Sequence, residues 1–172
     1  MKNGNVISDI NKIFVELKKF SPSFYSINPP VDNKLVERFE KEFQLELPAD
    51  YKYLLSQTNG FEFTCDEIYG ITWNEYGEDL VNVYKREHFD VAFPQFKYLI
   101  PFCPDGGGNF YCFDTKVKTN NGNYNNIFFL HSNYEYKEYN KPEITHKCLA
   151  DFINECILGW TMELYNYDGS KK

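Results

Sequence analysis

The spacing of apolar residues changes along this chain, and this change constrains the fold more than any other feature. Up to about residue 55, apolar positions recur every three or four residues, as on one face of an α-helix. Beyond residue 61 they mostly alternate or follow one another directly, which is typical of β-strands, and helical spacing returns after residue 145. The order of helices, strands and a last helix predicts an α+β domain with N-terminal helices, a largely antiparallel sheet and a C-terminal helix packed on the sheet.

Three helices are predicted before the strands. The first covers about residues 6–19 and stops before Pro22. The second follows Asp32, whose side chain is suited to capping a helix N-terminus. The third begins at Pro48 and ends at Asn59 and Gly60, a pair that commonly ends helices.

The strand predictions fall into two groups. A strand over 61–65 is expected to pair with 68–71, and longer apolar runs indicate strands over 96–103, 109–114 and 127–131. The segment 74–89 is a weaker helix or a structured loop, and 119–126 is an Asn- and Gly-rich loop.

The C-terminal helix has the clearest pattern. Thr145 is expected to cap it, with Ile144 and Leu149 in contact across the first turn. The apolar stripe comprises Leu149, Phe152, Ile153, Cys156, Ile157 and Trp160. With 172 residues and no visible linker or repeat, the chain is expected to form one domain over 1–172 with its core at about 30–162.

The charge balance narrows the classes of partner. Eighteen Lys and Arg residues against 25 Asp and Glu give a net charge of −7, which disfavours binding to nucleic acid. An acidic surface attracts basic proteins, although it is also an ordinary way to keep a cytosolic domain soluble. No run of about 20 apolar residues is present to span a membrane. We therefore expect a cytoplasmic protein that binds neither nucleic acid nor membrane.

The cysteines and histidines give no metal-site pattern. Five widely spaced cysteines, an odd number, indicate reduced thiols in the core. His146 and Cys148 are the nearest to a pair of metal ligands, but two such residues do not form a zinc-binding motif. We therefore expect neither a metal nor another cofactor.

Two candidate catalytic arrangements are weaker than their structural alternatives. The run from Asp105 to Asn109 contains three glycines but lacks the Lys and the following helix of a phosphate-binding loop, so a hairpin turn is favoured. Cys103 or Cys112 could meet His131 across strands as a nucleophile with its base, but buried structural thiols are more common. Adjacent acids, as in 66–67 and 78–79, more often mark a solvated turn.

The segment 73–79 is the best candidate for a contact surface. It combines two large aromatic side chains with three acids, and Trp and Tyr are enriched at binding hot spots. In the alternative interpretation, Trp73 simply covers the edge of the sheet. The predicted partner-binding residues are Trp73, Glu75, Tyr76, Glu78, Asp79 and, from the glycine turn, Asp105.

Two motifs in this order resemble the SUKH superfamily, the Smi/Knr-like domains. The first is Leu47-Pro48 with Tyr51, Leu54, Leu55 and Asn59-Gly60, and the second is Ile100-Pro101 with Asp105-Gly106-Gly107-Gly108-Asn109. The resemblance implies an α+β domain without catalysis. Bacterial members are immunity proteins that bind and neutralise a toxin domain, and fungal relatives regulate cell-wall synthesis through protein contacts.

The resemblance therefore implies an immunity-type protein whose partner is a cognate toxin domain, such as a basic nuclease. Two alternatives remain. One is a regulatory or scaffold module with peptide ligands, and the other is an enzyme or small-molecule binder that uses the aromatic face of the sheet.

Overall fold

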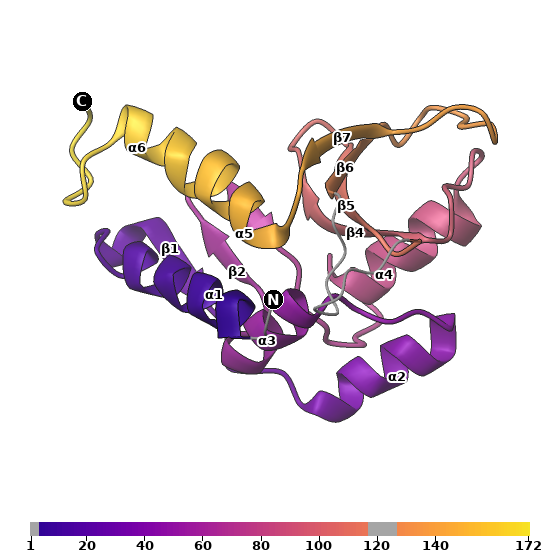
Figure 1. The fold of residues 1–172 in the computed structure, drawn as a ribbon, viewed down its shortest axis with the longest axis horizontal. Helices are drawn as coiled ribbons and strands as arrows, with labels where there is room; N and C mark the ends of the chain where they lie inside the picture. Colours follow the sequence, from indigo (N-terminus) through magenta and orange to yellow (C-terminus); the bar gives the residue numbers. More distant parts are fainter. Residues whose placement is uncertain (1–3, 117–126) are drawn as a thin grey trace.

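The computed structural model describes residues 4–116 and 127–172, and in this part the chain forms two antiparallel sheets with helices around them (Figure 1). The first sheet has the order β1-β2-β3 and the second β4-β5-β6-β7. The strands are β1 (Tyr25–Ile27), β2 (Phe61–Phe63), β3 (Asp66–Ile68), β4 (Leu99–Pro104), β5 (Phe110–Asp114), β6 (Ile127–Leu130) and β7 (Glu143–His146). The α+β prediction is confirmed, and the predicted loop at 119–126 lies outside the described residues.

The predicted N-terminal helices are confirmed as α1 (Gly4–Leu17), α2 (Asn33–Phe43) and α3 (Ala49–Gln57). Asp32 caps α2 by accepting a hydrogen bond from the Lys34 amide at 3.0 Å. Pro48 stands at the N-cap of α3, one residue before the expected position. A short 3₁₀ turn, η1 (Pro22–Phe24), leads from the first helix into β1.

The second strand of the β2–β3 hairpin, β3, begins two residues earlier than predicted. Phe63 pairs with Asp66, so only Thr64 and Cys65 form the turn. Thr64 has a φ of 57°, which fits a type II′ turn, in which the first central residue has positive φ. Residues 66–67 therefore lie in a strand, and the expectation of a solvated turn there is wrong.

The segment predicted as a helix or a loop contains both. Residues 72–79 form the loop, and α4 (Leu80–Lys85) follows and continues into a π-helical turn, η2 (Arg86–Asp90). The two sheets meet just after β3, where the Tyr69 amide donates to the Phe102 carbonyl in β4 at 2.9 Å.

The C-terminal helical run consists of α5 (Leu149–Phe152), a π-helical segment η3 (Ile153–Gly159) and α6 (Trp160–Leu164). Thr145 lies in β7, so its predicted capping role is wrong, and Cys148 occupies the N-cap. Trp160 is 49% exposed, whereas Thr161 is buried. A π-helical turn contains more residues than an α-helical turn. The predicted apolar stripe assumed α-helical spacing, and it therefore placed the last buried position at residue 160 instead of 161.

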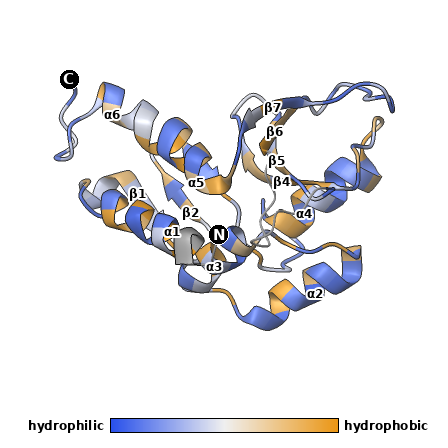
Figure 2. Cartoon of the chain, viewed as in Figure 1, coloured by the Kyte–Doolittle hydropathy of each residue, from blue (hydrophilic) through white to orange (hydrophobic). Residues whose placement is uncertain are grey.

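The core lies between the helices and the two sheets. Tyr51 of α3 is fully buried, its ring centroid lies 5.1 Å from that of Phe113 in β5 at a tilted angle, and its hydroxyl donates a hydrogen bond to the Tyr69 carbonyl. Phe152 of α5 packs edge-on against Phe102 of β4, which places the C-terminal helix on the second sheet. Figure 2 shows hydrophobic residues along β4 to β6 and a largely hydrophilic α2. None of the helices in the described ranges combines the length and apolarity that a membrane span requires.

Candidate protein-interaction surface

The loop 72–79 between β3 and α4 is held by one buried carboxylate. Asp79 is 4% exposed, and its Oδ2 accepts hydrogen bonds from the Thr72 amide and hydroxyl at 2.9 and 2.6 Å and from the Trp73 amide at 3.2 Å. Its Oδ1 accepts from the Asn82 amide at 2.8 Å and so caps α4. Asp79, predicted as a contact residue, thus anchors the loop from inside instead of presenting its charge at the surface.

The tip of the loop is fixed by a second side chain. The Asn82 side-chain amide donates to the carbonyls of Asn74 and Gly77 at 2.9 and 3.0 Å. Between these two carbonyls lie Glu75 and Tyr76, both exposed, with Tyr76 at 88%. The loop therefore presents an aromatic and an acidic side chain on a backbone that is already ordered, which lowers the entropic cost of binding.

Trp73 packs on α2. Its ring lies parallel to Phe43 with a centroid distance of 6.3 Å, and the Arg38 guanidinium lies 3.7 Å from the ring centroid. Its indole N–H donates to the Leu35 carbonyl at 3.2 Å. Trp73 is half-buried in these contacts and joins the loop to α2.

Glu78 connects the loop with the second sheet. Its carboxylate receives two hydrogen bonds from Arg86, at 2.6 and 3.1 Å, and the Arg86 guanidinium lies 5.9 Å from the ring of Phe110 in β5. The β4–β5 turn that carries Asp105 immediately precedes Phe110 in sequence. Arg86 thus contacts the loop and β5, whereas no hydrogen bond or ion pair between the loop and Asp105, the sixth predicted contact residue, occurs among the residues that the structure describes.

Asp105 organises its own turn. Its carboxylate accepts hydrogen bonds from the amides of Gly107 and Asn109 and from the Asn109 side chain, at 2.7 to 2.8 Å. Burial alone would raise the pKa of Asp105, but these hydrogen bonds outweigh it and lower the pKa. The side chain is exposed on the surface while it serves the turn.

An acidic groove of about 440 Å³ runs beside the loop. Residues 28–32 form one wall, and Thr72, Glu78 and Glu67 contribute to the other. Glu67 pairs directly with Glu62 across β2 and β3, a like-charged arrangement that disfavours the sheet. Burial raises the pKa of Glu67, and the charges of Glu62 and Glu78 raise it further. Sequence reasoning missed Glu62 and Glu67, because only strand pairing brings them together.

The thiols do not form the pairs considered from the sequence. Cys112 pairs in register with Phe128, and His131 lies beyond the end of β6, so this thiol and imidazole are not opposite each other. Cys103 lies in β4 and pairs with Tyr111 of β5, and β4 is not a neighbour of β6 in the sheet. Burial raises the pKa of Cys112 and of Cys103 well above the usual value, which keeps both thiols protonated. All five cysteines are free, and Cys65 is exposed, so the prediction of a core thiol is wrong for it.

One thiol–imidazole contact was not predicted. Cys156 Sγ lies 3.5 Å from His146 Nε2, and Glu155 Oε2 lies 3.5 Å from the same nitrogen. Burial raises the pKa of Cys156 to about 12, and the charge of Glu155 adds to this effect, so the thiolate needed for nucleophilic attack is scarce near neutral pH. No group of three or more potential metal ligands occurs in residues 4–116 and 127–172.

Comparisons with known proteins agree with this architecture. The model of the SMI1 / KNR4 family (SUKH-1) matches residues 30–155. A crystal structure of a protein from Pseudomonas syringae pv. tomato has a similar fold, with a TM-score of 0.60 and 16% sequence identity over 87% of this chain and 98% of that one. Comparison with curated proteins gives no significant match.

Proposed function

Because the chain belongs to the SMI1 / KNR4 family (SUKH-1), we propose that it is a non-catalytic protein-binding domain, of the immunity type that neutralises a cognate toxin by direct binding. The proposal places the protein in the cytoplasm, where a toxin delivered into the cell would be met. Its partner is a basic toxin domain, and the whole chain acts as one domain without a cofactor.

The observation that carries this proposal is the ordered loop 72–79 beside the acidic groove. Buried Asp79 and the Asn82 amide hold the backbone, so Tyr76 and Glu75 are presented without a large entropic cost on binding. An exposed tyrosine next to acidic side chains suits a basic protein surface, since the ring supplies buried area and the charges speed the encounter.

The thiol chemistry also supports a binding role. The buried thiols have raised pKa values, as noted for Cys112 and Cys156, and this favours a structural over a nucleophilic role. The aromatic strands β4 to β6 carry mainly buried side chains, which favours packing over a ligand pocket on that sheet.

Co-production with a toxin tests the proposal. The candidate is the C-terminal domain of a large secreted polypeptide encoded beside this chain, produced together with the chain in a bacterial host. We expect the wild-type chain to restore growth and to co-purify with the toxin domain. Tyr76→Ala is expected to weaken the complex by about 2 kcal/mol, the usual threshold of a hot spot.

Tyr139→Ala is the matched control, because Tyr139 is 79% exposed but belongs to a different loop. It is expected to protect as well as the wild type. Growth arrest with no complex would contradict the immunity role, and weak binding to several unrelated proteins would favour a regulatory or scaffold module.

A further inference from the structure

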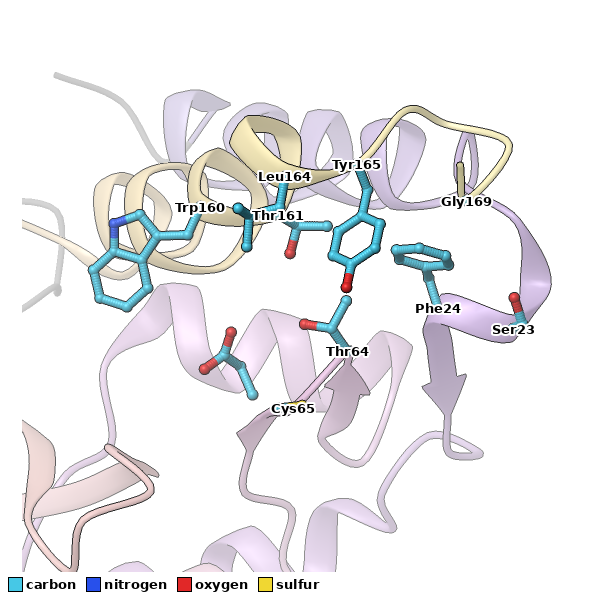
Figure 3. Close-up of a pocket in the computed structure, with 10 residues that line it drawn as sticks. Ser23, Phe24, Thr64, Cys65, Trp160, Thr161, Leu164, Tyr165 and Gly169 are labelled. Atoms are coloured by element: carbon cyan, nitrogen blue, oxygen red, sulfur yellow. The ribbon is translucent and has the colours of Figure 1, made fainter. Parts of the chain in front are cut away.

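A second hollow lies away from the loop 72–79, between α6 and the turn of the β2–β3 hairpin (Figure 3). It has a volume of about 480 Å³. Trp160 and Leu164 of α6 and Tyr165, the residue after this helix, line one side of it, Thr64 lies opposite them, and Phe24 lies beside Tyr165. We call it the C-terminal groove.

The walls of the C-terminal groove are apolar and partly open to solvent. Trp160 is 49% and Leu164 63% exposed. Tyr165 meets Phe24 edge to face with a centroid distance of 5.3 Å, so this end of the groove is preformed by packing. Large apolar side chains gathered around a hollow commonly mark a binding surface.

Asp66 brings a carboxylate into this apolar groove. It pairs with fully buried Phe63, so the two side chains share the core-facing side of the hairpin. No hydrogen bond or ion pair to its carboxylate occurs among the residues that the structure describes. Burial raises the pKa of Asp66, because the charged form lacks compensation.

We propose that the C-terminal groove binds an arginine side chain of a partner protein. The Asp66 carboxylate pairs with the guanidinium, the Trp160 ring offers it a stacking face, and an apolar residue beside the arginine packs on Leu164. A planar guanidinium satisfies a carboxylate and an aromatic ring together, which the compact ammonium of lysine does less well. A negative charge without a partner, set in an aromatic groove, selects this chemistry over a purely apolar ligand.

Peptide titration tests the groove without any toxin, so it can fail or succeed independently of the immunity role. The probe is the capped tripeptide Leu-Arg-Leu, followed through backbone amide and indole resonances in ¹H–¹⁵N spectra. We expect shifts of the Trp160 indole and of residues 64–66 at peptide concentrations up to about 10 mM, the range of weak contacts. Leu-citrulline-Leu, which has the same shape without the charge, is expected to bind at least about fivefold more weakly.

Two variants locate the effect. Asp66→Asn is expected to weaken the arginine peptide at least about fivefold while the spectrum remains that of a folded protein. Glu163→Gln removes an equal charge from α6, at a position that does not line the groove, and is expected to leave binding unchanged. Equal affinity for both peptides, absence of shifts, or equal effects of the two variants would overturn the proposal.

Sedimentation distinguishes a second copy of the chain from an arginine-bearing partner. We expect the wild type and Trp160→Ala to sediment alike. A wild-type dimer that Trp160→Ala dissociates would assign the groove to self-association and overturn the proposal.

Discussion

Of the three non-glycine residues with positive φ in the described part of the chain, Thr64 at 57° lies in the C-terminal groove and Trp73 at 58° lies in the loop 72–79. A β-branched or bulky residue in this conformation costs on the order of 1–3 kcal/mol and persists only where its surroundings hold it. Asp79 and the stacking on Phe43 hold Trp73, and the two-residue turn holds Thr64. Both surfaces are thus maintained at some cost to stability.

Asp50 in α3 carries a pH dependence that can be measured. Asp50 is 3% exposed, and its carboxylate accepts hydrogen bonds from the amides of Tyr51 and Leu149, which ties α3 to the start of the C-terminal helix. Burial raises the pKa of Asp50 from 3.8 to about 6, and the hydrogen bonds oppose this rise without cancelling it. The folded state therefore takes up a proton at higher pH than the unfolded state.

Asp50→Asn tests this linkage. At pH 7 the wild type pays for a buried charge that the variant lacks, and this cost disappears as the pH falls from about 6 to 3.8. We expect the wild type to gain about 3 kcal/mol of unfolding free energy relative to the variant over this range, from about two units of pKa. Urea unfolding at several pH values measures the difference, and a difference that stays constant with pH would refute it.

Gly60, between α3 and β2, shows why an element boundary can require one residue type. A Cβ built there would lie 2.4 Å from the Ile68 carbonyl oxygen and 2.6 Å from the Gly70 nitrogen, and φ is 73°. Gly106 in the β4–β5 turn has a similar φ of 75°, but no atom lies within 4 Å of such a Cβ. The two positions therefore separate backbone strain from steric contact.

Gly60→Ala is expected to lower the unfolding free energy by about 3 kcal/mol or more, because backbone atoms must move as well. Gly106→Ala is expected to cost about 1 kcal/mol, from backbone conformation alone. Chemical denaturation of both variants compares them. If both variants lost the same unfolding free energy, the backbone around Gly60 would accommodate the added Cβ without further cost, and the steric argument would be wrong.

The elements that could be predicted are those with a strong side-chain period. Helical spacing and caps located α1, α2 and α3, whereas β1 and β7 were missed. β1 has only three residues, and β7 has no fully buried side chain, so both depend on backbone pairing that leaves little trace in the pattern. The π winding of η3, which moved Trp160 to the surface, likewise has no simple sequence signal.

The candidate surfaces could be predicted only where they are local in sequence. Composition located the loop with Glu75 and Tyr76, but the burial of Asp79 follows from hydrogen bonds that the sequence does not specify. The C-terminal groove joins residues near 24, 65 and 160, and this proximity depends on how the helices pack on the first sheet.

At the scale of the whole molecule, the net charge of −7 gives the proposed toxin complex a salt dependence. Glu75→Lys combined with Glu78→Lys is expected to slow association about tenfold at low salt and less at high salt, since ions screen exposed charges. Asp79 stays unchanged, because its replacement would disturb the loop. Surface plasmon resonance with the toxin domain at two salt concentrations measures the association rate.

Glu163→Lys with Asp168→Lys makes the same change in net charge at exposed positions near the C-terminus. A similar slowing in this control would attribute the effect to overall charge. If neither double variant changed the association rate, the loop 72–79 would not be part of the interface.

The two-residue turn at Thr64 and Cys65 has a consequence for insertions and deletions. Successive strand residues point to opposite sides, so β3 directs Asp66 toward the C-terminal groove and Glu67 toward the acidic groove. One added residue that shifted β3 by a single position would exchange the two carboxylates and turn Ile68 away from the core. Length variation at this hairpin would therefore alter both grooves at once, whereas the β4–β5 turn could change length without touching either acid.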